Sequence, residues 1–275
     1  MFNKKTRSFF MIPYVLWMLL FVVFPLLLIV YYSFRDLDGN FTFENYRIFF
    51  SSTYVVMTLY SFWYAFLITL ICLVISYPLA FVAFAINKSK HKELLLLLII
   101  LPTWINILLK TYAFLGLFGE YGTVNNVLEY LGIGTQSLLF NSFSFVFVSS
   151  YIFLPFMLLP IYNSVVGINK NLIEASYDLG ADFKTTFRKI ILPLSINGVK
   201  TGIQVTFIPA LSLFMITRLV AGNKIINLGT AIEEHFIVTQ NWGLGSTIAV
   251  FLTVVMGIIM IVTNTKDKVS IGGRK

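Results

Sequence analysis

The stretch Glu174–Leu194, EASYDLGADFKTTFRKIILPL, is rich in charged side chains, although the sequence on either side of it is mostly apolar. Its apolar residues recur every three or four positions, which is typical of a helix with one apolar face. Gly180 interrupts this periodicity and suits the left-handed end of a helix, while Asp182 suits the N-cap of the next one. Asn171, three residues before the first glutamate, is placed to cap the first helix. We therefore predict a helix, a turn and a second short helix that stops at Pro193.

The chain as a whole has the composition of a membrane protein. Of its 275 residues, 58% are hydrophobic and only 12% are charged, against about 25% charged residues in soluble domains. A helix needs roughly 20 apolar residues to cross a bilayer, because its backbone polar groups must be satisfied within the segment. The apolar runs are continuous rather than alternating, which excludes a closed barrel. We predict an all-α polytopic protein with six spans, at about 14–32, 59–86, 94–118, 143–166, 199–220 and 246–263.

The first and fifth of these runs need comment. Basic residues before the first run also fit a signal peptide, but its length and the lack of a small-residue cleavage site favour a retained anchor. Charged side chains interrupt the fifth run, and Pro209 lies at its middle. Cys72 is the only cysteine, so the chain can form no internal disulfide.

The distribution of lysine and arginine orients the predicted spans. With six spans both termini lie on one side, and that side carries most of the basic residues, from Lys4 through Lys88 to Lys266 and beyond. The opposite loops hold only Arg35, Arg47 and Lys224. By the positive-inside rule the basic side is cytoplasmic, which accounts for the net charge of +8 without a nucleic-acid partner. The segment at about 167–197 is then a cytoplasmic loop.

A charged helix pair in the cytoplasm needs a surface that covers its apolar face. Lys184, Arg188 and Lys189 fit anionic lipid headgroups, as in an amphipathic helix that lies on the membrane. A pair broken by glycine is better suited to a groove in another protein, because glycine permits a tight turn and close backbone approach.

The loop is similar to a known motif. The spacing Glu174-Ala175-Ser176, three residues, Gly180, nine residues, Ile190-x-Leu192-Pro193 resembles the cytoplasmic EAA loop of permease subunits of ATP-binding-cassette (ABC) importers. Ser176 replaces the second alanine of the motif, a small-for-small change. The resemblance implies a single domain over 1–275 with the type I importer permease fold, and a loop that docks as a coupling helix in a cleft of a separate ATPase, with Glu174 as polar anchor and Gly180 as the turn. The loop residues it implies are Glu174, Ala175, Ser176, Asp178, Gly180, Ala181, Ile190, Leu192 and Pro193.

The resemblance also implies the partners. The chain has no G-x-x-x-x-G-K-[ST] motif to cradle phosphates, so it is expected not to be an enzyme, and ATP and magnesium would be bound by two ATPase subunits. No cofactor or metal is expected in this chain. In this family a second, similar permease chain completes the path through the cell membrane, and an extracellular binding protein or lipoprotein delivers the substrate.

Three segments narrow the resemblance to the spermidine/putrescine branch of these permeases. They are LLLLIILPTWINILLKTYAFLGLFG (Leu95–Gly119), FIPALSLFMITRLVAGNK (Phe207–Lys224) and NWGLGSTIAVFLTVVMG (Asn241–Gly257). The first is the most specific, because P-T-W-I-N is followed by a basic residue and a tyrosine. The implied function is ATP-driven import of polyamines by alternating access, and import of another small solute or ion is the alternative.

The candidates for the substrate path are aromatic, amide and basic residues in the spans. Lys110 follows Pro102 in an apolar run, and an ionisable residue in a span is a functional-site hypothesis, although Lys110 equally fits snorkelling to the outer interface. Arg218 stands where many polyamine permeases have an acidic residue, so we expect a gate or an ion pair with Glu233 or Glu234 rather than contact with a cationic substrate. Polyamines need aromatic faces and hydrogen-bond acceptors. The candidates are Trp104, Asn106, Lys110, Tyr112, Tyr151, Asn163, Arg218 and Trp242.

Other functional classes fit less well. A secondary transporter is expected to have carboxylates within broken helices, but the predicted spans contain no Asp or Glu. An enzyme needs cooperating side chains, whereas His91 and His235 lie on opposite sides in the predicted topology. A membrane scaffold is the third alternative, and it predicts that changes at Glu174 and Gly180 leave transport intact.

Overall fold

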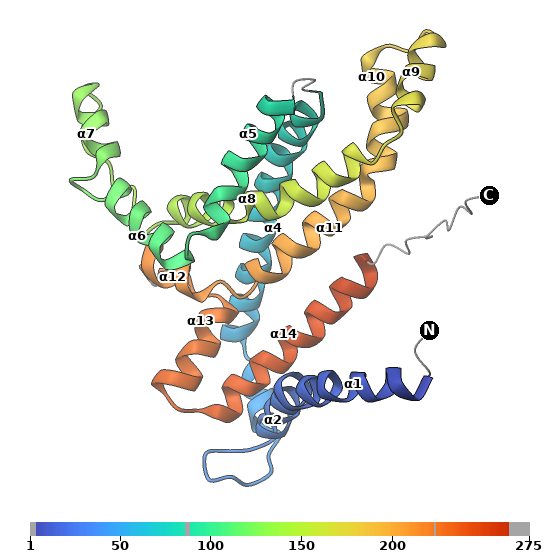
Figure 1. Ribbon diagram of the computed structural model, residues 1–275. Coiled ribbons are helices and arrows are strands. Elements are labelled where there is room, and N and C mark those ends of the chain that lie inside the picture. Colours follow the sequence, from blue (N-terminus) through green and yellow to red (C-terminus); the bar gives the residue numbers. More distant parts are fainter. Residues whose placement is uncertain (1–3, 86–88, 223, 264–275) are drawn as a thin grey trace. The chain divides into compact units, whose positions relative to one another are not determined.

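The computed structural model describes residues 4–85, 89–222 and 224–263 (Figure 1). Apart from an isolated bridge between Arg35 and Phe41, the described residues form helices, turns and loops, which confirms the all-α class. The basic residues predicted for the cytoplasmic side at Lys88 and from Lys266 onward lie outside the described residues, as does the side chain of His91. The chain forms two compact units, one up to Thr58 with Leu228–Val255 and one from Leu59 to Asn227 with the residues from Met256 on.

The helices follow one another along the chain with short connections. In order they are α1 (Lys4–Met18), the π-helical turn η1 (Leu19–Val23), α2 (Phe24–Ser33), α3 (Glu44–Phe49), α4 (Ser52–Ala85), α5 (Ser89–Ile100), the 3-10 turn η2 (Leu101–Trp104), α6 (Ile107–Phe118), α7 (Thr123–Tyr130), α8 (Ser142–Val166), α9 (Lys170–Asp178), α10 (Phe183–Thr186), the π-helical turn η3 (Phe187–Ile191), α11 (Leu192–Ala210), α12 (Phe214–Val220), α13 (Leu228–Glu233), the π-helical turn η4 (Glu234–Val238) and α14 (Trp242–Thr263).

Four helical segments among the described residues are long and apolar enough to cross a membrane. They are Met11–Ser33, Ser52–Phe84, Ser142–Val166 and Trp242–Thr263, in agreement with four of the predicted runs. Their burial within the chain differs widely. In the most apolar 18 residues of Met11–Ser33 none are buried, whereas 61% of the corresponding residues of Ser142–Val166 are.

The runs predicted at 94–118 and 199–220 are bent rather than straight. The first divides into Glu93–Trp104 and Ile107–Tyr130, which lie at 99° to one another. The second divides into Phe183–Ala210 and Phe214–Val220, at 61°. A proline lies just before each break, Pro102 in η2 and Pro209 at the end of α11, and neither can donate a backbone hydrogen bond to continue the helix. With each bent pair taken as one span, the described residues have up to six spans.

In the first unit, α2 is joined to α3 and α14 at its C-terminal end. The carbonyl of Ser33 accepts hydrogen bonds from Thr247 Oγ1 and from Asn45 Nδ2, both at 3.2 Å. Asn45 Nδ2 also donates to the carbonyl of Arg35 at 2.8 Å. Gly243 is required at this contact, because a Cβ atom there would lie 2.2 Å from the Arg35 carbonyl oxygen.

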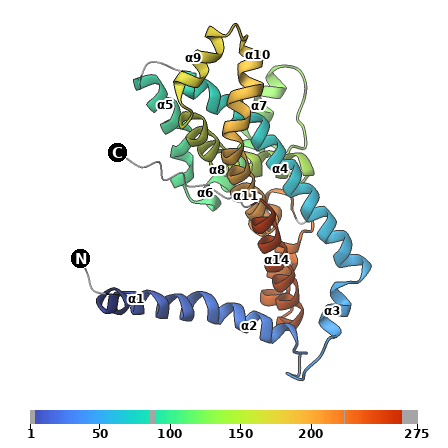
Figure 2. The ribbon, with the colours of Figure 1, turned by 90° about the vertical axis from the view of Figure 1, so that its right-hand side faces the viewer.

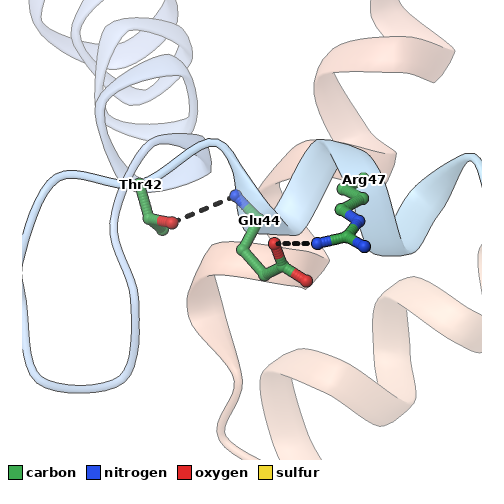
Figure 3. A network of polar contacts seen from close by, with 3 residues as sticks. All are labelled: Thr42, Glu44 and Arg47. Atoms are coloured by element: carbon green, nitrogen blue, oxygen red, sulfur yellow. Dashed lines mark hydrogen bonds and ion pairs between the residues drawn. The ribbon is translucent and has the colours of Figure 1, made fainter.

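The connection from α2 ends at α3, whose first turn is held by polar contacts (Figure 3). The hydroxyl of Thr42 accepts a hydrogen bond from the backbone N–H of Glu44 at 3.0 Å. One turn later, Arg47 lies 3.6 Å from the Glu44 carboxylate. Both side chains of this ion pair are mainly exposed, so its contribution to stability is small.

In the second unit, α8 and α11 lie side by side (Figures 1 and 2), and α4 packs along α8. Cys72 Sγ donates to the carbonyl of Ser150 at 3.4 Å, and Ser76 Oγ donates to that of Leu154 at 3.3 Å. Cys72, Ser76 and Ala80 are each fully buried. Small side chains at intervals of four residues let helix backbones approach closely, which is how helices associate in membranes.

Candidate functional site

The predicted helix, turn and helix form at the end of the α8–α11 hairpin. α9 ends at Asp178, and Gly180 has a φ of +78°, the left-handed conformation predicted for it. The N–H of Gly180 donates to the carbonyl of Tyr177 at 2.9 Å, and that of Ala181 to the carbonyl of Ser176 at 3.0 Å. Nothing lies within 4 Å of the position that a Cβ of Gly180 would take. Backbone conformation, rather than space, therefore calls for glycine here.

The helix caps are as predicted at Asp182 and differ at the first helix. Asp182 Oδ1 accepts a hydrogen bond from the N–H of Thr185 at 3.0 Å. Contacts with Thr185 hold the pKa of the Asp182 carboxyl below its usual value, because they favour the charged form. The prediction that Asn171 caps α9 is wrong. The cap is Asn169, whose side chain accepts from the N–H of Asn171 at 3.0 Å, so the helix begins two residues earlier.

The prediction that the second helix stops at Pro193 is also wrong. α10 continues through the π-helical turn η3 directly into α11, and Pro193 lies in the first turn of α11. Pro193 has no N–H to donate, and it follows directly on the π-helical turn, where the regular i to i−4 pairing is already interrupted. In η3 the N–H of Leu192 bonds to the carbonyl of Phe187, so the chain passes into α11 without a break.

The two helices of the loop are joined by a hydrogen bond between hydroxyl groups. Ser176 Oγ lies 2.9 Å from Thr186 Oγ1, and both residues are buried. One of the two hydroxyls donates to the other, and the hydroxyl that accepts is free to donate to a carbonyl of its own turn, Ser176 to that of Ile173 at 2.7 Å or Thr186 to that of Asp182 at 3.1 Å. The serine that replaces the motif's second alanine thus fixes α9 against α10, a contact that alanine cannot make. We call this pair the hydroxyl clip.

Two glycines hold the arms of the hairpin together. A Cβ at Gly198 would lie 2.5 Å from the carbonyl oxygen of Pro160, and one at Gly202 would lie 2.7 Å from Met157 Sδ. Gly198 and Gly202 form a G-x-x-x-G sequence, which places both glycines on the α11 face that meets α8. The loop is therefore attached to a closely packed helix pair.

The turn presents an exposed, mixed surface. Leu179 is 89% exposed, the highest value in the loop among the large hydrophobic side chains, and Phe183 is 53% exposed. Of the motif residues, only Ser176 is buried, Ala181 and Ile190 are half-buried, and the others are exposed: Glu174, Ala175, Asp178, Gly180, Leu192 and Pro193. An exposed leucine at a tight, hydrogen-bonded turn is the arrangement expected for a knob that enters a groove.

The bend in the first broken span carries four of the substrate-path candidates. Trp104 ends η2 and is 84% exposed, and Asn106 caps α6 by accepting from the N–H of Leu108 at 2.8 Å. Lys110 is only 8% exposed, whereas Tyr112 is 55% exposed. Irregular backbone at membrane depth is tolerated where it is buried in protein or lines a cavity. α12, the short arm of the second bend, packs on α6.

The other candidates are dispersed. Arg218 is exposed on α12, and its predicted pairing with Glu233 or Glu234 stays a prediction, because these glutamates belong to the other compact unit. Asn163 is exposed near the C-terminal end of α8. Trp242 belongs to the first unit, where its ring meets that of Tyr32 edge-on, with centroids 5.6 Å apart.

Tyr151 lines a cavity of about 590 Å³ between α4 and α8. The walls are mostly apolar and aromatic, with Trp63, Tyr64 and Phe147 among them. The hydroxyl of Ser150, which also lines the cavity, is buried and has no hydrogen-bond partner. Among the described residues no group of three or more His, Cys, Asp or Glu side chains is placed to hold a metal.

No family model matches the chain, but individual known proteins are similar to it. It is 34% identical over 260 residues to the spermidine/putrescine transport system permease protein PotB of Haemophilus influenzae, with 92% of this chain and 91% of that protein covered. It is 34% identical over 256 residues to PotB of Escherichia coli K12, with 90% and 92% covered. The chain belongs to the PotB permease family.

Membership of the PotB family confirms the resemblance carried by the loop and by the three segments. The fold agrees with it. A chain of a bacterial alginate ABC transporter, crystallised in complex with an alginate pentasaccharide-bound periplasmic protein, matches with a TM-score of 0.82 at 17% identity, over 94% of this chain and 93% of that one. This PotB-family chain therefore has the ABC importer permease fold and is a multi-pass membrane protein, and its relatives are permease components of transport systems.

Sequence reasoning missed the residues that hold the α8–α11 hairpin and its loop together in this PotB-family chain. The G-x-x-x-G of Gly198 and Gly202 was a readable signal for close helix packing. The hydroxyl clip gave no such signal, because Ser176 and Thr186 meet only after the turn at Gly180 brings α9 and α10 together.

Proposed function

We propose that this chain is the transmembrane subunit of an ATP-driven importer that carries spermidine and putrescine across the cell membrane by alternating access. The observation that supports it most strongly is the 34% identity, over more than nine-tenths of the chain, with permeases named for spermidine and putrescine transport. The helix, turn and helix that the loop forms are consistent with that identity. The alternative, another small solute carried by the same permease class, rests on no observation of its own.

The coupling loop is the part that receives energy. ATP and magnesium would be bound by two copies of a separate ATPase, and the exposed knob at Leu179 would enter a cleft in one of them, with Glu174 as a polar anchor at its edge. When the ATPases close, the knob is displaced. The hydroxyl clip and the glycine contacts between α8 and α11 then make the hairpin move as a body.

The substrate path is proposed to lie where the bent spans meet, completed by a second, similar permease chain. The exposed faces of Trp104 and Tyr112 suit ammonium groups through cation–π contact. Lys110 and Arg218 are cations and repel a polyamine, so we assign them to gating rather than to binding. An extracellular binding protein would supply most of the selectivity.

The test is energy-dependent uptake of radiolabelled spermidine and putrescine in three strains: with the gene, without it, and with a Glu174→Ala copy. We expect uptake to disappear without the gene and to remain low with the variant, while the variant is present in the membrane at the normal amount. A matched control is Glu129→Ala in α7, an acidic residue away from the loop, which should retain uptake.

The possible outcomes separate the parts of the proposal. Unchanged polyamine uptake in all strains would overturn the substrate assignment, and competition by other small solutes would then identify the cargo. Loss of uptake on gene deletion together with full uptake in the Glu174→Ala strain would retain the substrate and remove Glu174 from coupling.

A further inference from the structure

The cytoplasmic end of α4 contacts the coupling hairpin through aromatic rings. The ring of Phe81 lies 5.5 Å from that of Phe183 and 6.1 Å from that of Phe187, between centroids. The ring of Tyr77 meets Phe187 edge-on at 5.7 Å. Phe183 and Phe187 belong to α10 and η3, immediately after the turn, so two rings of α4 touch the part of the loop nearest the knob.

A hydrogen bond joins the same helix to the start of α11. Tyr77 OH lies 2.6 Å from Ser195 Oγ, and Ser195 is fully buried. Ser195 also donates to the carbonyl of Leu192 at 3.2 Å, which fixes its hydroxyl. α4 is thus connected on both sides of the π-helical turn η3. Short π-helical turns within α-helices frequently mark functional positions.

Farther along, α4 is attached to α8 by two hydrogen bonds. Cys72 and Ser76 donate to carbonyls of α8 along a face of small, buried side chains. Beyond this face, residues 63–75 of α4 form one wall of the 590 Å³ cavity, and α8 forms the other. A displacement of the α4 cytoplasmic end therefore changes the shape of that cavity.

We propose that α4 is a second lever of the coupling loop, and that Tyr77 and Phe81 are the positioning residues through which the loop moves it. The inference rests on the proposed function, since it requires an ATPase to displace the loop. It goes beyond it, because it assigns coupling to a helix outside the α8–α11 hairpin. In the variants below, the hairpin would still bind the ATPase but would no longer carry α4 with it.

The test uses the complete importer, reconstituted in liposomes with its ATPase, its second permease chain and its binding protein. ATP hydrolysis and spermidine uptake are measured in the same samples for Phe81→Leu and Tyr77→Phe. We expect the number of ATP molecules hydrolysed per spermidine imported to rise by about threefold to thirtyfold, the span seen for changes between coupled sites. A merely structural role would lower hydrolysis and uptake together and leave this ratio unchanged.

Matched controls come from the exposed face of the same helix. Phe66→Leu and Tyr60→Phe change residues that are 51% and 53% exposed, and they should keep the normal ratio. Ser195→Ala should also raise the ratio, because it removes the Tyr77–Ser195 hydrogen bond together with the one to Leu192, and adding Tyr77→Phe to it should raise the ratio no further. If Phe81→Leu does not assemble, Tyr77→Phe decides, since it removes only a hydroxyl group.

An unchanged ratio in both Tyr77→Phe and Phe81→Leu would overturn the α4 proposal. A normal complex that hydrolyses ATP but imports no spermidine or putrescine would instead overturn the proposed function. The two failures are distinguished because the first is seen in the variants and the second in the unmodified complex.

Discussion

The α8–α11 hairpin and the first span are both built from apolar helices, but they differ in how much of each is packed within the chain. Most of the apolar window of α8 is buried, and α8 meets α11 at Gly198 and Gly202. In Met11–Ser33 none of the apolar window is buried. The apolar content of a membrane helix therefore does not show what covers it. A helix covered by its own chain can transmit displacement, whereas the side chains of the first span are left for lipid or another subunit.

A direct way to break this comparison is a matched pair of leucine truncations. Leu158 in α8 is fully buried, and Leu27 in α2 is 60% exposed. We expect Leu158→Ala to lower the free energy of unfolding by about 2–5 kcal/mol, because it leaves a cavity. Leu27→Ala should change it by less than about 0.5 kcal/mol. Thermal unfolding of the detergent-purified chain measures both, and equal effects would contradict the comparison.

The close approach of α8 and α11 can be tested at Gly198. An added methyl group would meet the backbone of Pro160, so we expect Gly198→Ala to cost about 1–3 kcal/mol of stability. The control is Gly257→Ala in α14, where nothing lies within 4 Å. It should be neutral or stabilising by up to about 1 kcal/mol, because alanine favours the helix. Equal melting temperatures for the two variants would argue against close packing.

The turn itself depends on a left-handed residue. Gly180→Val should reduce uptake by about tenfold or more, because a β-branched residue at a φ of +78° is strained by about 1–3 kcal/mol and the knob is displaced. Gly180→Asn is the matched control, since asparagine tolerates this conformation, and it should keep most uptake. Both are measured at equal amounts of protein in the membrane. Equal uptake by the two variants would rule out a conformational requirement.

The smallest expected effect concerns the hydroxyl clip. Ser176→Ala should lower stability by about 0.5–1.5 kcal/mol, the net value of one hydrogen bond. A double-mutant cycle with Thr186→Val separates the pair from other effects. If the two changes add fully, Ser176 and Thr186 do not act together, and the clip would not distinguish this loop from one that carries the second alanine.

The sequence was sufficient for features that depend on local chemistry. Gly180 and Asp182 fill the conformations expected of a helix end and an N-cap, and four predicted runs are continuous helical segments. It was not sufficient for the bends of 99° and 61°. Apolar residues continue across both breaks, so hydropathy alone does not reveal where a helix changes direction. Pro102 and Pro209 lie just before the two breaks, but proline alone does not fix the angle, which depends on how the next helix packs.

Candidate site residues divide in the same way. The exposed loop residues follow from the motif. Lys110, Tyr151, Asn163 and Trp242 were singled out because each is a polar or aromatic residue in a predicted span, but they lie in different places in the fold. Tyr77 and Phe81 looked like ordinary span residues, because their contacts with Ser195, Phe183 and Phe187 join segments about a hundred positions apart. Sequence spacing carries no information on such contacts without homologous sequences.

The burial of Cys72 makes this chain well suited to spectroscopic labelling. It is the only cysteine, and it lies fully buried between α4 and α8 with its thiol directed at the Ser150 carbonyl. Maleimide or nitroxide reagents should react slowly with it. In a Leu179→Cys variant that keeps Cys72, the introduced cysteine would then be the main reactive thiol. A spin label or fluorophore attached there could follow the knob through the ATP cycle.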